Sequence, residues 1–392
     1  MLFYYSFAPA RRIGSLEFRS AILSGNQGHP MSVQASSLDL HPTFVTTNAW
    51  RSRTLAAILM IVIAGIFWAD SRYPALLKRY HTGTEVKAAG ALTFSAVYRV
   101  DRTMPLSTRV WRTTLNWLDA NRIGMTFSFL FGPAALTFLA TLRRRRTSSI
   151  YLNTLFGAAA GMPLAVCTNC VAPIARGFYA SGMSTESVLA AMFASPALNV
   201  VVLAMTFALF PVPIALLKLA TVLFLIFVFA PATASRRGAI APYVCPIEIP
   251  VSQTWGQALV STTRSYLRSF WYVFRVAFPL MIFAAVLGAL VIELLPAEAL
   301  VAEATIGGIV LVALVGAFLP VPMAFDVAIA YIAMTKGVPL PYVVTILCTL
   351  GIVSVFSLSV VGKTISWKVA AAAYATVGAL GTVAGLLSRF LA

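Results

Sequence analysis

The sequence predicts an all-α integral membrane protein with two inverted repeats, a Gly/Pro-broken re-entrant hairpin in each repeat, and one extra N-terminal span. Composition is the first reason: 59% of the 392 residues are hydrophobic and 10% are charged, whereas soluble proteins carry about 25% charged residues. The apolar residues also cluster into runs near the ~20 residues that cross a bilayer. The third reason is an internal similarity between the two halves of the apolar region.

The net charge of +17 is distributed as in membrane proteins rather than as on a nucleic-acid-binding surface. Lys and Arg gather in the N-terminal tail, in residues 72–122 and in short loops such as 143–146. Juxtamembrane Lys and Arg hold loops on the cytoplasmic side and contact anionic lipid headgroups. Because no recognition motif accompanies the charge, the expected partners are the lipid bilayer and a small-molecule substrate, without nucleic acid.

Nine apolar runs are expected to form the membrane region. They are residues 55–71, 122–142, 150–181, 185–210, 212–232, 270–295, 302–335, 340–361 and 367–391. The chain accordingly divides into five parts: a disordered N-terminal tail (1–53), a first transmembrane span and extramembrane loop (54–121), a first repeat (122–233), a cytoplasmic connecting loop (234–269) and a second repeat (270–392). The tail lacks the continuous apolar stretch of a secretory signal peptide.

Two of these runs, 150–181 and 302–335, are too long for one ordinary span and are interrupted by Gly and Pro. The interrupting residues are Gly161, Pro163, Pro173 and Gly177 in the first run and Gly316, Pro320 and Pro322 in the second. Proline breaks a helix, and in a membrane the freed carbonyls find partners only inside protein or beside a watery cavity. Broken helices form the substrate sites of many secondary transporters, so we expect a transport site here.

A shift of 155 residues aligns the two halves of the apolar region. It pairs Gly161 with Gly316 and Gly182 with Gly337, and the runs around these glycines have similar boundaries. The loop before the first broken run contains four arginines, whereas glutamates surround the start of the second. Since positive charge marks the cytoplasmic side, the two repeats are expected to enter the membrane from opposite faces.

The inverted arrangement requires each broken run to be a re-entrant hairpin, which leaves three full crossings per repeat. The residues that it places on the cytoplasmic side are Arg51, Arg53, Arg236, Arg237, Arg264, Arg268, Lys363 and Lys368, as the positive-inside rule requires. It places the basic loop after residue 72 outside, where long loops follow the rule less closely. If each broken run instead crossed once, Arg236 and Arg237 would lie outside.

The most distinctive local pattern is Cys167-Thr168-Asn169-Cys170, at the breakpoint of the first hairpin. Two thiols three residues apart can coordinate a soft metal or metalloid, act as a redox pair, or fill a tight helix contact as small apolar residues. Four cysteines are too few for a disulfide framework, and one pair supplies only two of the four ligands of a structural zinc site. No resident metal or cofactor is therefore expected.

Two charged residues lie inside the broken runs. Arg176 would neutralise an anionic substrate or extend to the cytoplasmic interface. Asp326 would couple transport to a proton, or form a structural ion pair with Arg176 or Lys218. Lys218 and Arg275 lie nearer the ends of their runs, so their side chains are expected to snorkel to the interface.

Polar residues at a second kink complete the expected site. Pro196 opens the backbone before Asn199, whose amide offers both a donor and an acceptor to a substrate. The repeat places Ser354 at the position that matches Asn199. Hydrogen bonding between helices is the alternative role for both residues.

In these residues the sequence resembles the predicted-permease family that includes the organoarsenical exporter ArsP and the YraQ-type permeases. The resemblance covers about residues 120–390 and rests on Pro163, the Cys167–Cys170 pair, Pro173, Gly182 and the segment Ala194–Asn199. The family typically has a glycine after the second cysteine, where this chain has Val171, and the second copy here lacks cysteine in the matching place. The resemblance implies a permease fold and role, but not a specificity for trivalent arsenicals.

The sequence favours a multi-pass secondary transporter of the cell inner membrane, not an enzyme, that moves a small thiol-reactive solute or one containing sulfur or a metalloid. The expected substrate-binding residues are Cys167, Thr168, Asn169, Cys170, Pro173, Arg176, Pro196, Asn199 and Ser354, with Asp326 for proton coupling. The sequence has no GxxxxGK[ST] string, the pattern of a nucleotide-binding loop, so the energy for transport would come from an ion gradient or a partner protein. A homo-oligomer is compatible with the sequence. The alternatives are a membrane thiol-disulfide oxidoreductase that uses the cysteine pair, a passive channel, and a scaffold subunit.

Overall fold

The computed structural model describes residues 50–74, 77, 97–101, 103–142, 149–235, 254–294 and 304–390. Within these ranges all regular secondary structure is helical, which confirms the predicted all-α class. The described helices belong to one compact unit over residues 47–392. Predictions that concern the N-terminal tail up to residue 49, the loop at 143–146, Arg236 and Arg237 lie outside the described residues.

The first half of the chain opens with α1 (Trp50–Phe67), which continues into the π-helical turn η1 (Trp68–Arg72). The helices that follow are α3 (Leu106–Ala140), α4 (Ile150–Gly161), α5 (Thr168–Ala180), α6 (Thr185–Ala197) and α7 (Val200–Leu209). This half ends with α8 (Val212–Phe224), the π-helical turn η3 (Leu225–Phe229) and α9 (Ala230–Ser235). We call residues 162–167, between α4 and α5, the first break.

The second half repeats this order of elements. It contains α10 (Trp255–Leu294), α11 (Ile306–Phe318), α12 (Phe325–Thr335), α13 (Leu340–Thr349), α14 (Val355–Val361), the π-helical turn η5 (Gly362–Ser366) and α15 (Trp367–Leu387). We call residues 319–324, between α11 and α12, the second break. Equivalent features recur 155 residues apart: Gly182 and Gly337 both have positive φ (88° and 79°), and Asn199 and Ser354 are both helix N-caps.

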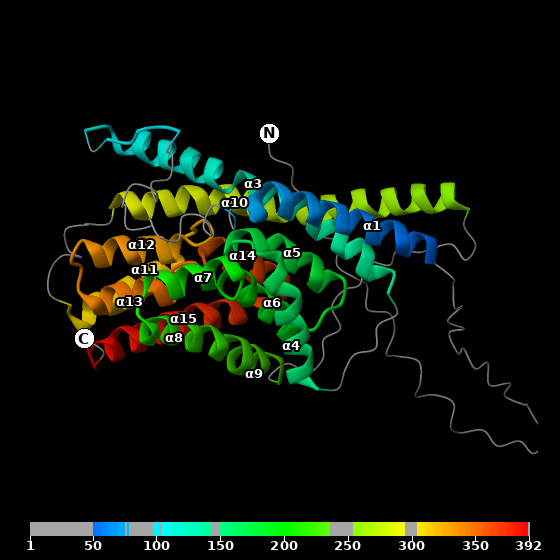
Figure 1. Cartoon of the computed structure of the whole chain (residues 1–392). Helices are drawn as coiled ribbons and strands as arrows, with labels where there is room; N and C mark the ends of the chain where they lie inside the picture. The colour runs from blue at the N-terminus through cyan, green and yellow to red at the C-terminus, as the bar shows by residue number, and fades with distance from the viewer. Residues whose placement is uncertain are drawn as a thin grey trace, which may run out of the picture. The chain divides into compact units, whose positions relative to one another are not determined.

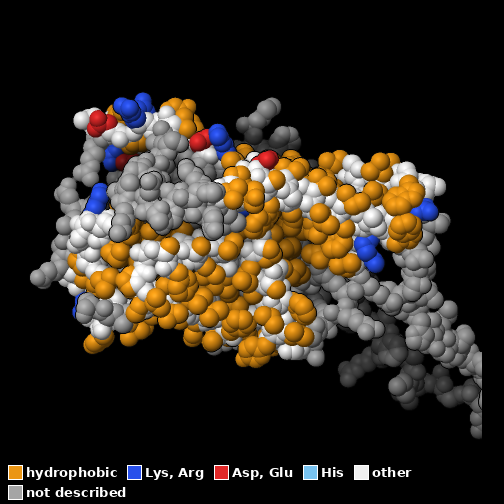
Figure 2. Space-filling model, viewed as in Figure 1, with side chains coloured by type: hydrophobic (Ala, Val, Ile, Leu, Met, Phe, Trp, Pro, Cys, Tyr) orange, Lys and Arg blue, Asp and Glu red, His pale blue; other side chains and the backbone are white. Residues whose placement is uncertain are grey.

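Several of the described helices are long and apolar enough to cross a membrane. By length and composition they are residues 50–72, 106–140, 212–233, 255–294 and 355–390, and the pair α6–α7, bent by 48°, would add one more. Figure 2 shows hydrophobic side chains over much of the visible helical surface, with Lys and Arg mostly toward its ends. This distribution is that of a multi-pass membrane protein, as composition predicts.

Three helices begin earlier than predicted. α1 begins at Trp50, inside the predicted tail, and α3 and α10 begin at Leu106 and Trp255, well before the predicted starts at residues 122 and 270. Residues 106–121, predicted as part of an extramembrane loop, are therefore helical. The reason lies in periodicity, because the buried residues Thr114, Asn121 and Met125 recur along one face of α3 and give its polar N-terminal half a packed side.

The two runs predicted as single spans with a kink, 185–210 and 340–361, are each divided into two helices. α6 and α7 are separated at residues 198–199, and α13 and α14 at residues 350–354. Pro196 disrupts the hydrogen bonding of the first pair, and Gly351 takes a positive φ of 79° in the second. The kinks were therefore expected, and the three full crossings per repeat stay a prediction.

Glycine contacts fix the direction of the helix before each break. Gly157 and Gly161 of α4 face the backbones of Ser187 and Ala191 of α6, and a Cβ on either glycine would lie within 2.5 Å of an α6 carbonyl oxygen. Residue numbers rise together along this contact, so α4 and α6 run in the same direction. α5 lies antiparallel to α6, since Ser195 near the end of α6 bonds to the backbone just before α5.

The second half shows the same register. Gly308 of α11 faces Tyr342 of α13, and Gly316 faces Thr349, so these two helices also run in the same direction. The first helices of the two halves, α3 and α10, run antiparallel: Arg109 pairs with Glu293 at one end. Figure 1 shows the broken helices lying between α3 and α10 on one side and α8 and α15 on the other.

Candidate functional site

The candidate site begins at the first break. Ala165 takes a left-handed conformation (φ 47°) that redirects the chain, and Cys167 is the N-cap of α5. Its Sγ accepts a hydrogen bond from the backbone N–H of Cys170 at 3.2 Å, so the thiol occupies the role that a hydroxyl or carboxylate usually fills. Thr168 and Asn169 lie in the first turn of α5.

Asn169 joins the first break to the other half of the molecule. Its Nδ2 donates to the carbonyl of Val321 in the second break at 3.0 Å, and its Oδ1 accepts from the hydroxyl of Ser354 at 2.7 Å. The hydroxyl of Thr168 donates to the carbonyl of Ile352 at 3.0 Å. Three predicted site residues therefore meet at the junction of the two breaks, where all three are buried.

Two indoles satisfy further carbonyls of the breaks. Trp68 in η1 donates through Nε1 to the carbonyl of Pro163 at 2.9 Å, and Trp117 in α3 donates to the carbonyl of Pro320 at 2.6 Å. An unsatisfied backbone group inside a membrane costs several kcal/mol, so these bonds stabilise the irregular backbone. Sequence reasoning missed both tryptophans, because a side chain that bonds a distant carbonyl leaves no local pattern.

Both thiols of the pair are free and almost fully buried, with Cys167 3% and Cys170 2% exposed. Cys167 Sγ donates to Oδ1 of Asn121 on α3 at 3.6 Å. Cys170 Sγ packs against Gly124, where a Cβ would lie only 2.6 Å from the sulfur. Gly124 therefore makes room for the second thiol, and the predicted contact of the pair with a soft ligand stays a prediction.

The described residues bring no second thiol pair to this one. Cys348 lies on α13 in a different hydrophobic cluster, close to Lys218 and Asp326. The same ranges contain no group of three or more His, Cys, Asp or Glu side chains that could hold a metal ion. Two thiols, a hydroxyl and an amide thus lie in four consecutive residues at the start of α5, and their substrate-binding role stays a prediction.

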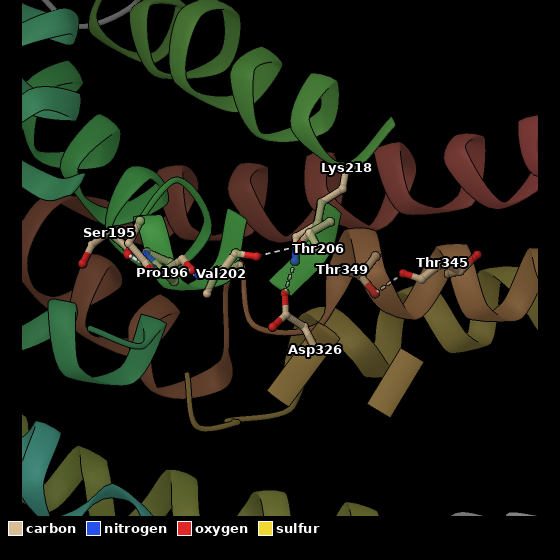
Figure 3. Close-up of polar contacts among 9 residues, drawn as sticks. Ser195, Pro196, Val202, Thr206, Lys218, Asp326, Thr345 and Thr349 are labelled. Atoms are coloured by element: carbon tan, nitrogen blue, oxygen red, sulfur yellow. Dashed lines mark hydrogen bonds and ion pairs between the residues drawn. The ribbon is translucent and has the colours of Figure 1, made fainter. Parts of the chain in front are cut away.

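A buried ion pair connects the two halves at another point. Lys218 on α8 donates through Nζ to the carboxylate of Asp326 in the first turn of α12, and the two side chains are 4% and 9% exposed. Figure 3 shows Lys218 extending toward Asp326 beside Thr206 of α7. The predicted snorkelling of Lys218 is wrong, because its partner is an acid inside the protein. The proton-coupling role of Asp326 stays a prediction.

Arg176 lies near the C-terminal end of α5 and is 7% exposed. Its Nη1 donates to the hydroxyl of Thr364 at 3.1 Å, and its guanidinium lies 4.2 Å from the ring centroid of Tyr272. Among the described residues Arg176 forms no ion pair with a carboxylate. Arg176 was predicted either to neutralise an anionic substrate or to extend to the cytoplasmic interface. Its buried position disfavours the second role.

The remaining predicted residues shape the backbone. Asn199 caps α7: its Oδ1 accepts from the N–H of Val202 at 3.0 Å, and its Nδ2 donates to the carbonyls of Ser195 and Pro196. Figure 3 labels the three residues that bond to Asn199, which are Ser195 and Pro196 of α6 and Val202 of α7. Pro173 lies within α5, where its carbonyl approaches Gly132 of α3. Neither Asn199 nor Pro173 reaches the Asn169 junction through a hydrogen bond that the structure shows.

One charged residue near the thiols was missed from the sequence. Arg72, predicted to begin an extramembrane loop, instead ends η1 and interacts electrostatically with both Cys167 and Cys170. The only sequence signal for it was its place at the end of the first apolar run, which is also where an interfacial arginine is expected.

Comparison with known proteins agrees with this architecture. A family model described as a predicted permease, ArsP_1, matches residues 136–390. The UPF0718 protein YraQ of Escherichia coli (strain K12) is 26% identical over 255 residues, which cover 63% of this chain and 70% of YraQ. No significant match to a solved structure was found.

Proposed function

Because the chain belongs to the ArsP_1 family of predicted permeases, we propose that it is a secondary transporter that exports a small thiol-reactive solute, containing sulfur or a metalloid, across the inner membrane. The observation that carries the proposal is the bonding of Asn169 to Val321 and Ser354 across the two halves. Secondary transporters bind their substrates where broken helices of two repeats meet.

The helix directions support two inverted repeats with re-entrant hairpins. In each half, the helix before the break runs parallel to the helix that follows the next turn. The helix between them must then return toward the face from which the chain came, which is the path of a re-entrant hairpin. The antiparallel packing of α3 against α10 agrees with an inversion of the second half relative to the first.

Contacts at one end of the helices support its assignment to the cytoplasm. Trp50 at the start of α1 packs against Trp255 at the start of α10, with ring centroids 5.2 Å apart, and Arg53 donates to the carbonyl of Thr141 after α3. Arg264 and Arg268 lie near the same end of α10. The positive-inside rule places such an end in the cytoplasm.

We assign the chemical roles according to the side chains that meet at the junction. Cys167 and Cys170 supply soft donors for a sulfur or metalloid centre, while Thr168 and Asn169 supply hydrogen bonds to its polar substituents. Protonation of the Asp326 carboxylate would break its buried ion pair with Lys218 and release α12 from α8. Binding of a proton would in this way be coupled to a movement of the helices.

Transport by the purified chain in liposomes tests the proposal. The panel contains trivalent organoarsenicals, soft metal ions and small sulfur compounds, and the variants are Cys167→Ser/Cys170→Ser and the matched control Cys348→Ser. We expect one compound class to be moved by the wild type and the control, and at least about tenfold more slowly by the double variant. Failure of the wild type to move any member of the panel would count against the proposed solute class.

Reporter fusions after Arg146, at Ser235 and after Pro296 test the inverted arrangement separately. We expect the first two sites to report the cytoplasmic side and the third to report the opposite side. A fusion at Ser235 that reports the outside would show that the broken segments cross the membrane once rather than returning.

A further inference from the structure

Arg72 is a partly buried cation near the cysteine pair. Its guanidinium lies within electrostatic range of the sulfurs of Cys167 and Cys170, and its Nε is buried without a hydrogen-bond partner among the described residues. The contacts that the structure shows for the rest of the guanidinium are neutral: Nη1 donates to Ser71 Oγ at 3.3 Å, and the Phe67 ring centroid lies 4.6 Å away. The ion pairs among the described residues do not include Arg72, and a membrane interior makes an unpaired cation costly.

Two independent contacts hold η1 against the site. The indole of Trp68 bonds to the carbonyl of Pro163 in the first break at 2.9 Å. The ring of Phe67 stacks on Phe127 of α3, with centroids 4.0 Å apart. The placement of Arg72 therefore follows from packing on both sides of the turn. A π-helical turn is itself a feature that is frequent at functional sites.

The N-terminus of α5 adds positive potential at the same place. α5 has 13 residues, and Cys167 is its N-cap and accepts a hydrogen bond from the N–H of Cys170, so the positive end of the helix dipole lies beside the thiols. Helix N-termini bind anions because their N–H groups and the helix dipole both favour negative charge. Arg72 and the N-terminus of α5 therefore favour the same kind of ligand.

A cavity lies next to η1, between α1 and α3. It has a volume of about 440 Å³, and apolar side chains form most of its lining, with Asp70, Ser71, Arg122 and Thr126 as the polar residues. Phe67 and Ser71, which contact the Arg72 guanidinium, also line it. The cavity thus reaches two immediate neighbours of Arg72, and its volume suits a small ligand.

We propose that Arg72, the N-terminus of α5 and the thiols of Cys167 and Cys170 form a binding site for a small anion that carries a soft sulfur atom, with thiosulfate as the model ligand. The guanidinium and the helix N-terminus bind the anionic oxygens, and the polarisable thiols contact the soft atom. This inference rests on the proposed function and narrows its substrate class to anions. It also assigns a substrate-binding residue to η1, which lies outside the residues matched by the family model.

Thiol labelling of the folded, full-length chain tests the site without measuring transport. A negatively and a positively charged methanethiosulfonate of similar size are compared, with peptide mass spectrometry reporting on Cys167 and Cys170 separately. The measured quantity is the ratio of the labelling rate with the anionic reagent to that with the cationic reagent. We expect this ratio, which we call the preference, to be at least about tenfold higher for the protein than for free cysteine. The ratio of the two rates corrects for any change in thiol ionisation, because that change affects both reagents equally.

The variants separate charge from structure. Arg72→Gln should abolish the preference and Arg72→Lys should keep most of it, whereas Arg122→Gln should change it little because Arg122 is exposed and paired with Asp119. Asp70→Asn, which removes a negative charge from the cavity rim, should raise the preference. Thiosulfate should slow labelling of the wild type but not of Arg72→Gln, and sulfate at the same concentration should protect less.

The outcomes are distinct from those of the transport experiment. An equal ratio in the wild type and Arg72→Gln, equal protection by sulfate and thiosulfate, or no labelling by either reagent would overturn the anion site. If thiosulfate protects the thiols but liposomes show no transport of any solute, the proposed function fails and the anion site stands. If a neutral solute is transported and Arg72→Gln leaves the labelling ratio unchanged, the proposed function stands and the anion site fails.

Discussion

The first and second breaks share a backbone plan and differ in chemistry. Each contains one residue in the left-handed region, Ala165 in the first and Ala324 in the second, and each gives a carbonyl to an indole. The first break leads into a helix capped by a thiol, whereas the second leads into a helix whose first turn holds Asp326. The comparison shows that two breaks with a similar backbone carry different side chains, thiols after the first and a buried charge after the second.

Removal of the lysine from the ion pair should have the largest effect, and it tests the charged half of the comparison. Lys218→Met leaves the Asp326 carboxylate buried without its partner, and we expect a loss of about 3–5 kcal/mol in the free energy of unfolding, measured in detergent. The double variant Lys218→Met/Asp326→Leu should recover most of this stability and lose ion-coupled transport. A single variant as stable as the wild type would show that the pair does not hold α8 to α12.

The glycines before the two breaks should respond differently to alanine. A Cβ at Gly161 would lie 2.4 Å from a backbone oxygen of α6, whereas one at Gly316 would meet the side-chain oxygen of Thr349. Because a backbone yields less easily than a side chain, we expect Gly161→Ala to cost about 2–3 kcal/mol and Gly316→Ala about 1 kcal/mol. Unfolding measurements with Gly307→Ala as the control, where a Cβ meets nothing within 4 Å, check the difference; equal losses would contradict it.

The amide that joins the breaks should matter more for transport than for stability. Asn169→Ala removes the donor to Val321 and the acceptor for Ser354, and we expect a loss of about 1–3 kcal/mol together with loss of transport per folded molecule. Thr206→Val, which removes a buried hydroxyl bonded within α7, is the matched control and should keep transport. Normal transport by Asn169→Ala would remove the junction from the substrate path.

The two matched N-caps should give the smallest effects. Asn199→Ala removes the cap of α7 and the donors to two carbonyls, so we expect a loss of about 1–2 kcal/mol. Ser354→Ala removes the cap of α14, at about 1 kcal/mol, and also the bond to Asn169. Only the serine variant should therefore lower the transport rate as well as the melting temperature. An equal loss of transport in both variants would contradict the prediction that only Ser354 acts on transport.

The sequence was sufficient to locate the breaks that position the site. Gly and Pro interrupt a helix in a way that composition reveals, so the first and second breaks fall within the runs predicted to be broken. The paired positive-φ glycines Gly182 and Gly337 also fall on the predicted 155-residue shift. These features are local, because a proline or a left-handed glycine affects the backbone wherever the rest of the chain lies.

Contacts between distant segments were not predictable in the same way. Lys218 was expected at the interface because its position near the end of an apolar run is typical of snorkelling. The ion pair with Asp326, 108 residues away, was named only as an alternative beside a pair with Arg176, and the structure confirms the lysine. Trp68, Trp117 and Arg72 reach the site from helices outside the predicted repeats. Their roles depend on helix packing, which hydrophobic periodicity does not specify.

The bond between Asn169 and Ser354 has a consequence for biosynthesis. The two residues are 185 positions apart, and ribosomes add about 5–20 residues per second. At that rate α5 is made roughly 10–40 s before its partner on α14. During that interval the Asn169 amide and the Thr168 hydroxyl must bond to water, to lipid headgroups or to the insertion machinery, so the hydrogen bonds at the start of α5 are completed only after the last helices have been synthesised.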